Sequence, residues 1–478
     1  MPVQTAGSST KTNPTALAVL TTLFFMWGFI TCMNDILIPA FKDNFALSYF
    51  QAFLVQFAFF GAYFIGSLIY FIISSTSSDP IQRIGYKNGI LLGLGVSALA
   101  CFLFYPAARF ESYGFFLTAL FVLGLGFTLL QITANPYVAI IGPSHTASSR
   151  LNLAQAFNSF GTTIAPLIGG YIVFEFFANE LGKPTLEGVE AMYPVFALVF
   201  ILVGVLIYFT ALPRIESEAV ERGFGALRFP WLVLGMVAIF TYVGGEVTVG
   251  SALINFFEEG MGLEKSKGDI FLAFYWGGAM IGRFLGAISL SEMQQGVKKF
   301  LLMAGVALLA FGVIYFAALT KSGFTLGFGE IAPFLGIVAL NLAGFVVGRS
   351  LPARTLGIFA SVNILLLLIT IATGGALAFW SVIGIGLFNS IMWSNIFTLS
   401  IDGLGKYTSQ GSSLLVMMVL GGALIPPLQG ALADWFVSTG DPAAVQHSFP
   451  IALICYAYLM FYGFRGYSLG KAKVQALD

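Results

Sequence analysis

The sequence consists of long apolar stretches that follow one another almost without interruption. Of its 478 residues, 58% are hydrophobic and only 9% are charged. A helix needs about 20 predominantly apolar residues to cross a bilayer, and the backbone polar groups of a spanning segment must be bonded within helices or within a closed barrel. We therefore predict an all-α integral membrane protein, with no room for a soluble catalytic domain.

Fourteen stretches have the length and composition of a spanning helix. When the amino terminus is placed inside, the predicted outer loops contain only six of the 22 basic residues, as the positive-inside rule requires. The tails at 1–14 and 468–478 are then both cytoplasmic, and we predict a multi-pass protein of the cytoplasmic (inner) membrane. The predicted spans lie at roughly 15–41, 51–74, 88–108, 113–142, 152–176, 192–212, 230–257, 269–291, 298–320, 331–348, 357–376, 378–400, 410–436 and 448–467.

The later part of the chain repeats the earlier part. The sequence around Gly28 matches that around Gly244, 216 residues later, and the sequence around Asn135 matches that around Asn395, 260 residues later. The difference between these two offsets corresponds to two spanning helices with short turns. We therefore predict that a two-helix hairpin at 298–348 is inserted in the second repeat.

A polar linker at 213–229 separates the two predicted halves, which lie at 15–212 and 230–467. Many transporters are built from two such repeats. Two parallel six-helix halves joined by a cytoplasmic linker resemble the major facilitator superfamily, and the extra hairpin brings the total to about 14 transmembrane helices. The resemblance implies a substrate site near the bilayer midplane, between halves that rock to alternate access.

Two acidic residues interrupt predicted spans. Asp35, beside Asn34, lies in the first span, and Glu246 lies in the seventh. An ionised carboxylate in the hydrocarbon region costs several kcal/mol even on lenient scales, so the group must face water, find a partner or take up a proton. We predict that Asp35 and Glu246 are sites of proton or ion coupling. A pairing of Glu246 across a helix interface is the structural alternative.

A set of amides and two tryptophans inside the predicted spans are candidates for the lining of a cavity. Amides donate and accept hydrogen bonds at once, which suits a neutral hydroxylated ligand, and an indole ring can stack on the apolar face of a sugar. Bridging between helices by the amides and ordinary packing of the tryptophans are the alternatives. The candidate ligands are Asn34, Gln131, Asn135, Gln155, Asn158, Glu246, Trp276, Asn389, Trp393 and Asn395.

Six stretches carry a closer resemblance to a known family. They are WGFITCMNDILIP, LLQITANPYVAIIGP, SSRLNLAQAFNSFGT, YVGGEVTVGSALINF, YWGGAMIGRF and GLFNSIMWSNIFTLSI. They resemble the fucose–proton symporter family, most of all its glucose/galactose transporter branch, over nearly the whole chain apart from the predicted hairpin. The resemblance implies hexose uptake driven by a cation gradient, with Asp35 as the proton-coupling residue and Asn158 as a sugar ligand. Where the fucose symporter has a second acid, this chain has Gln131, which cannot titrate.

Some charged residues suggest a gate rather than a substrate contact. Arg83 and Lys87, between the second and third spans, and Arg283, at the equivalent place in the second half, resemble weakened forms of the cytoplasmic gating motif of the superfamily. We expect these residues to act in the conformational change. His145 and His447 fall in predicted loops without metal-ligand partners, where we expect them to be solvated, and we predict no metal site.

The sequence leaves the ligand and the coupling ion open. Glucose or galactose is the predicted sugar substrate, with N-acetylglucosamine and fucose as alternatives, and the coupling cation is a proton or sodium. A transporter-derived sensor is a different class of function, whereas a drug exporter would need a more apolar cavity. No nucleophile–base pair, metal triad or nucleotide loop points to an enzyme or a cofactor. The zero net charge argues against a nucleic-acid partner, and we expect a monomer in the lipid bilayer.

Overall fold

The computed structural model describes residues 3–5, 11–45, 49–171, 186–216, 223–263 and 265–471, and almost all of these residues are helical. The side chains of some helical residues, among them those of 34–44, lie outside the description. In the described ranges, 13 helical segments are long and apolar enough to cross a membrane, so the predicted all-α membrane fold is confirmed. The predicted span at 152–176 corresponds to α6 (Ala147–Tyr171), which ends where a gap in the description begins.

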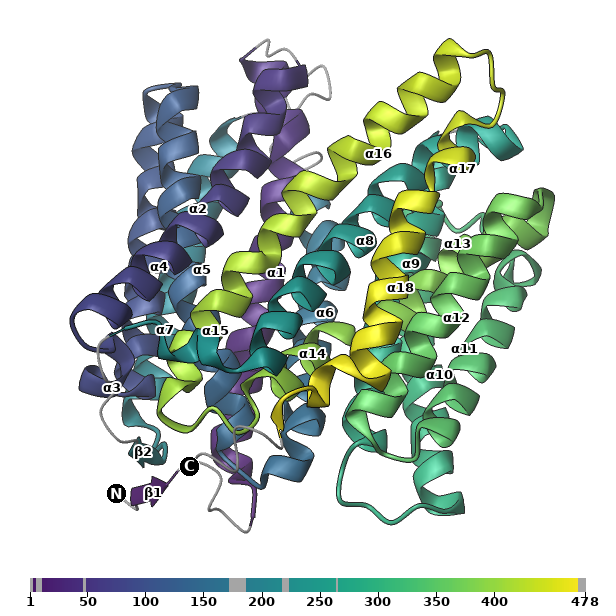
Figure 1. The fold of residues 1–478 in the computed structure, drawn as a ribbon. Coiled ribbons are helices and arrows are strands. Elements are labelled where there is room, and N and C mark those ends of the chain that lie inside the picture. The colour runs from purple at the N-terminus through teal and green to yellow at the C-terminus, as the bar shows by residue number, and fades with distance from the viewer. Residues whose placement is uncertain are drawn as a thin grey trace. The chain divides into compact units, whose positions relative to one another are not determined.

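The helices form two compact units (Figure 1). One helix, α6, belongs to both, because it begins in unit 2 and continues in unit 1 after Ser159. The span at Gly405–Ser438 likewise belongs to unit 1 up to Met417 and to unit 2 from Met418. Unit 1 comprises Met1–Ser144, Phe160–Arg228 and Gly403–Met417, and unit 2 comprises His145–Ser159, Phe229–Asp402 and Met418–Asp478.

Unit 1 is a bundle in which α4 packs against α5 and α7, while α2 packs against α5 and α15. The contact of α4 with α5 depends on small residues, since a Cβ added at Gly93 would lie only 2.9 Å from Leu130, and glycines allow membrane helices to approach closely. Two short strands, β1 and β2, pair in parallel at one end of this unit. Apart from α6, the elements are β1 (Val3–Thr5), α1 (Pro14–Asn44), α2 (Tyr49–Thr76), α3 (Pro80–Ile84), α4 (Tyr86–Arg109), α5 (Tyr113–Ile140), α7 (Leu186–Phe209), β2 (Arg214–Glu216), and α15 (Thr408–Met417).

Unit 2 is organised around α8, which packs against α9, α14, α16 and α18. In the same unit, α12 packs against α13 and α18, and α10 packs against α9. The elements are α8 (Pro230–Met261), α9 (Lys265–Ser289), α10 (Val297–Lys321), α11 (Phe328–Gly348), α12 (Pro352–Ala372), α13 (Gly375–Asn389), α14 (Met392–Ile401), α16 (Gly421–Ser438), α17 (Ala444–Ser448) and α18 (Pro450–Phe464).

One span of unit 2 is broken in its interior. The span at Gly375–Ile401 consists of α13, which ends at Asn389, and α14, which begins at Met392. A break inside a membrane leaves backbone groups that need partners from side chains or neighbouring helices. At this break, Asn389 and Ser390 lie among polar groups from other helices.

Candidate functional site

The first predicted coupling residue lies on α1. The backbone of Asn34 and Asp35 is helical and continues the long helix Pro14–Asn44, but both side chains lie outside the described residues. The assignment of Asp35 as the proton-coupling acid, and of Asn34 as a ligand, therefore stays a prediction from the sequence.

Three buried side chains from three helices meet around Gln131 in unit 1. The hydroxyl of Tyr63, on α2, lies near the side chains of Gln131, on α5, and Trp27, on α1. Their exposed fractions are 4% for Tyr63, 7% for Gln131 and 6% for Trp27. The sequence analysis did not single out Tyr63. The cluster places the Gln131 side chain in a buried polar environment.

Asn135 lies one turn further along α5 and is completely buried. Neither its amide nitrogen nor its carbonyl oxygen has a hydrogen-bond partner among the described residues. An unpaired buried polar group costs about 1–3 kcal/mol, so such a side chain is expected where a ligand, a water molecule or another conformation supplies the partner. The placement is compatible with the predicted binding role.

Two further candidate ligands lie three residues apart on α6. Gln155 is buried and Asn158 is partly exposed. The next residue, Ser159, accepts a hydrogen bond from the guanidinium of Arg283. The predicted sugar ligand Asn158 is therefore a sequence neighbour of a residue that contacts a half-buried cation.

Glu246, on α8, is held by two tyrosines. The hydroxyl of Tyr242 donates to Glu246 Oε1 at 2.8 Å, one turn away on the same helix. The hydroxyl of Tyr275, on α9, donates to the backbone carbonyl of Glu246 at 2.9 Å. Within the described part of the chain, Glu246 forms no ion pair within 4.0 Å. One hydrogen bond therefore holds the carboxyl group of Glu246, and another holds its backbone.

Asn389 is the hub that ties this cluster to other helices. Its amide nitrogen donates to the hydroxyl of Tyr275 at 3.1 Å, and its carbonyl oxygen accepts from Tyr456 on α18 at 2.8 Å and from Asn363 on α12 at 2.9 Å. Asn389 is completely buried. The structure thus brings this predicted ligand to Glu246, but its carbonyl oxygen is already shared by two protein donors.

Arg283 lies inside α9, within the span Ile270–Ser289. The sequence analysis placed it at the equivalent of the loop that contains Arg83, and that placement was wrong because α9 continues past it. Its Nε donates to the carbonyl oxygen of Ser390 at 3.1 Å, at the break between α13 and α14. The break supplies the backbone partner that allows an arginine to be accommodated inside a bundle.

The remaining candidates of unit 2 lie in different surroundings. Trp276, on α9, is 41% exposed, whereas Trp393, on α14, is 8% exposed and its Nε1 has no partner among the described residues. Asn395 is completely buried: its Oδ1 accepts from Asn152 and its Nδ2 donates to the carbonyl of Pro352, both at 3.0 Å. Asn395 therefore bridges helices, which is the alternative to ligand binding that the sequence analysis raised for these amides.

A second buried polar cluster surrounds Asp79, which the sequence analysis missed. Asp79 caps the amino end of α3 by accepting from the backbone nitrogen of Ile81 at 2.9 Å. It also accepts from the hydroxyls of Tyr70 at 2.7 Å, Ser409 at 2.6 Å and Ser74 at 3.2 Å. An acid directly before a proline is a signal for a helix cap, and this signal could have identified Asp79. The cluster ties α2, α3 and α15 together.

The predicted gating residues lie beside this cluster. Arg83 lies in the last turn of α3. Lys87 donates from Nζ to the backbone carbonyls of Tyr208 and Thr210, at 2.8 and 2.9 Å, where a cation at the carboxyl end of α7 interacts favourably with the helix dipole. Lys87 therefore connects α4 with α7.

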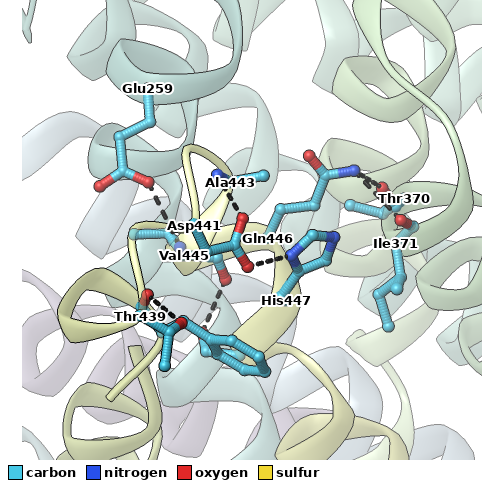
Figure 2. A network of polar contacts seen from close by, with 11 residues as sticks. Glu259, Thr370, Ile371, Thr439, Asp441, Ala443, Val445, Gln446 and His447 are labelled. Carbon is cyan, nitrogen blue, oxygen red and sulfur yellow. Dashed lines mark hydrogen bonds and ion pairs between the residues drawn. The ribbon is translucent and has the colours of Figure 1, made fainter. Parts of the chain in front are cut away.

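A polar network also joins the carboxyl ends of α8, α12 and α16 to the short helix α17 (Figure 2). His447 lies in α17, so the expectation of a loop residue was wrong, and it bonds to Asp441 at 2.5 Å while its side chain stays 41% exposed. Gln446 donates to the carbonyls of Thr370 and Thr373, each at 2.7 Å, and so satisfies groups at the end of α12. His145 likewise pairs with Glu292, at 3.5 Å. In the part of the chain that the structure describes, no group of three or more metal-ligating side chains is present.

Many spanning helices, a broken span and the acid Glu246 inside a span define the class of the protein as a polytopic membrane transport protein. The chain belongs to the major facilitator superfamily, whose family model matches residues 18–349. The predicted fold and family are therefore confirmed. The proteins of this family that the chain resembles are transporters and not enzymes.

Two relatives and one solved structure give the resemblance in more detail. The chain is 40% identical over 471 residues to the glucose/galactose transporter of Brucella abortus, covering 97% of both chains. It is 30% identical over 445 residues to the L-fucose-proton symporter of Escherichia coli, covering 87% of this chain and 86% of that one. The crystal structure of the Escherichia coli fucose:proton symporter superposes with a TM-score of 0.72 at 26% identity, covering 94% of this chain and 98% of the other.

Proposed function

We propose that the protein is a cation-coupled sugar symporter that imports a hexose such as glucose or galactose by alternating access, with a proton as the coupling ion. The observation that carries the proposal is the 40% identity to a glucose/galactose transporter along 97% of both chains. An acid inside a span, held by tyrosine hydroxyls rather than by an ion pair, supports the coupling part of the proposal. Such an acid is a functional residue by default.

The coupling mechanism assigns the proton to Asp35 and a second ion or proton site to Glu246. With these acids protonated in the outward-open state, the sugar binds and the carrier closes. Inward opening exposes the acids to the cytoplasm, where the proton leaves. Coupling requires that protonation and sugar binding favour each other, and this effect is reciprocal.

The sugar contacts are assigned to the polar candidates of the sequence analysis. Gln131 is buried near Tyr63, and on α6 Asn158 is partly exposed. In unit 2, Trp276 is exposed enough to stack on a sugar ring. Gln131 presents an amide where a fucose symporter has an acid, so hydrogen bonding to the sugar replaces titration at that position.

The domain arrangement is part of the proposal. The packing of α12 against α13 and α18 resembles that of α4 against α5 and α7, so α12 corresponds to the third helix of the repeat. The extra hairpin is then formed by α10 and α11, at 298–348, and the halves are 15–212 and 230–467. Both termini are cytoplasmic, the membrane is the inner membrane, and the protein is a monomer.

Counterflow in proteoliposomes tests the proposal. Vesicles loaded with unlabelled sugar should take up labelled glucose or galactose transiently above equilibrium, because a carrier exchanges the two. N-acetylglucosamine and fucose are measured in parallel as the alternative substrates, and sodium replaces the proton gradient as the alternative driving ion. Absence of counterflow for all four sugars would contradict a sugar carrier and would favour a transporter-derived sensor.

A further inference from the structure

A buried lysine holds one corner of unit 2 together. Lys299, in the first turn of α10, is 2% exposed. Its Nζ donates to the carbonyl oxygens of Ser289 and Met293, at 2.7 and 3.0 Å. It also donates to the hydroxyl of Ser350, in the turn between α11 and α12, at 3.1 Å. These acceptors satisfy the three donors of the ammonium group, so Lys299 holds the α11–α12 turn against the start of α10.

The backbone of this turn has an uncommon conformation. Arg349 and Ser350 both have positive φ angles, of 53° and 57°, which residues other than glycine rarely adopt. The hydroxyl of Ser350 also donates to the carbonyl of Ser289 and accepts from the amide of Gln295. Such strain persists only where the surroundings over-determine the conformation, and it is concentrated at functional sites such as ligand clamps. The turn therefore holds Arg349 in a fixed place beside the start of α10.

Three cations without a counter-ion surround the turn. Lys298, Arg349 and Arg354 are all exposed. Among the residues that the structure describes, none of the three forms an ion pair within 4.0 Å. Lys298 and Arg349 each precede one of the two residues whose side chains are in contact, Lys299 and Ser350. Arg354 lies in the first turn of α12, so the three cations gather at one corner.

The acids of the neighbouring elements leave this positive charge unbalanced. The helices α10 and α12 contain no acidic residue. On α11 the acid is Glu330, in the first turn, at the end away from Arg349. In the loop before α10, Glu292 pairs with His145 at 3.5 Å. The corner therefore suits an anion that comes from outside the described chain.

The corner lies where three candidate membrane spans begin or end. The spans are Val297–Lys321, Phe328–Gly348 and Pro352–Ala372, and their helices are neighbours in unit 2 (Figure 1). Apolar side chains beside the cations are exposed, among them Val347 and Leu351. In a membrane such side chains contact acyl chains, and cations at the ends of spans lie at the level of the lipid headgroups.

We propose that Lys298, Arg349 and Arg354 form a binding site for the phosphate of an anionic phospholipid, while the exposed apolar side chains beside them contact its acyl chains. Arginine donates charge-assisted hydrogen bonds to phosphate oxygens, and basic pockets between spanning helices bind anionic headgroups. Basic residues near span ends also orient a membrane protein, a role that requires only their number. The inference is independent of the proposed function, because it requires only that the chain spans a membrane.

Native mass spectrometry of the full-length protein in detergent tests the site. Phosphatidylglycerol and phosphatidylcholine with identical acyl chains are titrated in parallel. Wild type should bind phosphatidylglycerol more tightly by on the order of a hundredfold, because each cation near the surface contributes about fivefold. The triple variant Lys298→Gln, Arg349→Gln, Arg354→Gln should lose this preference.

A cation at the other end of α10 provides the matched control. Lys298→Gln should weaken the binding of phosphatidylglycerol about fivefold. Lys321→Gln removes the same charge from the opposite end of the same helix and should leave the affinity unchanged. Inorganic phosphate at the concentration of the lipid should not displace it, because the ion lacks the acyl chains.

A serine variant tests whether the turn positions the cations. Ser350→Ala keeps every charge and removes one acceptor of Lys299, so the affinity for phosphatidylglycerol should fall about fivefold, the equivalent of one hydrogen bond. Ser322→Ala is the matched control, since its hydroxyl bonds to the carbonyl of Leu319 near the other end of α10, and it should bind the lipid as wild type does.

The possible results separate a lipid site from a general effect of charge. Equal binding of the two lipids by wild type would overturn the inference, and so would equal losses in Lys298→Gln and Lys321→Gln. Displacement of the lipid by inorganic phosphate at equal concentration would overturn the assignment to a phospholipid. Wild-type affinity in Ser350→Ala would overturn the role of the turn. The substituted cations are exposed, so these variants should fold, and thermal unfolding of the same preparations verifies this.

Discussion

Replacement of Asp79 should destabilise the protein more than replacement of any exposed acid. The side chain is 1% exposed and accepts hydrogen bonds from the hydroxyls of Tyr70 and Ser409, at 2.7 and 2.6 Å, and from the nitrogen of Ile81 at 2.9 Å. Hydrogen bonds to a charged group are each worth about 1.5–3 kcal/mol, and removal of a shared acceptor leaves buried donors unpaired. We expect Asp79→Ala to lose on the order of 3–5 kcal/mol, which is less than the sum of the separate bonds because they act together.

The conservative variant separates the loss of the acceptors from the loss of charge. Asp79→Asn keeps one oxygen as an acceptor, and the hydroxyls of Ser74 and Ser409 can rotate to accept from the new amide, so we expect a loss of about 1–2 kcal/mol. Asp402→Asn is the control, because Asp402 is 56% exposed and pairs with Lys471 at 2.9 Å. Exposed pairs contribute about 0–1 kcal/mol.

Thermal unfolding of the detergent-solubilised protein measures the order of stability of the three variants. The midpoint temperature should fall most for Asp79→Ala, less for Asp79→Asn and least for Asp402→Asn. An Asp79→Ala variant as stable as Asp402→Asn would refute the reasoning, because it would mean that the buried donors find other partners at no cost.

Two further predictions concern other polar contacts. Asn389→Ala should reduce sugar uptake at least tenfold, because it removes the acceptor of Tyr456 and one of the two hydrogen bonds of Tyr275, whose other bond goes to the backbone carbonyl of Glu246, a loss of about 1.4 kcal/mol or more in the positioning of Glu246. Uptake by Asn341→Ala, a nearby buried amide outside this cluster, is the comparison. The hydrogen bond from His447 lowers the pKa of Asp441 below its usual 3.8. The ionised Asp441 therefore stabilises the fold above that value, and this stabilisation is lost as the pH falls through the lowered pKa. Asp441→Asn should lower the unfolding temperature at pH 7, and equal unfolding temperatures of wild type and variant at pH 7 would contradict the assignment.

Most of the architecture could be predicted because hydrophobicity sets the spans and the repeat sets their order. The span predicted at 230–257 corresponds to α8 (Pro230–Met261), and the span predicted at 88–108 corresponds to α4 (Tyr86–Arg109). Apolar length is a strong signal because spanning helices must satisfy their own backbone. Helix ends were less well predicted, since polar turns beyond the membrane can extend a helix.

The details of the candidate site could not be predicted in the same way. Asn389 and Asn395 have the same residue type and the same kind of surroundings in the sequence, yet the structure gives Asn389 a link to Glu246 and Asn395 a link to Asn152 and Pro352. The number of amide side chains in a span does not specify which groups each of them bonds to. The break beside Asn389 contains no proline or glycine, so the sequence carried no signal for the carbonyl that Arg283 contacts.

Asp79 was missed for a different reason. It lies between two predicted spans, where a charged residue is expected to be solvated, and only the three-dimensional arrangement brings Tyr70 and Ser409 to it. These two residues are far apart in the sequence, so their convergence is a tertiary property.

Accumulation of labelled sugar against its gradient tests the central claim most directly. Wild-type protein and Asp35→Asn are compared in proteoliposomes with an imposed proton gradient, with an imposed sodium gradient and with neither. We predict that wild type concentrates glucose or galactose when the proton gradient is imposed, and that Asp35→Asn only equilibrates the sugar across the membrane. Equilibration without accumulation by the wild type under both gradients would contradict cation-coupled symport.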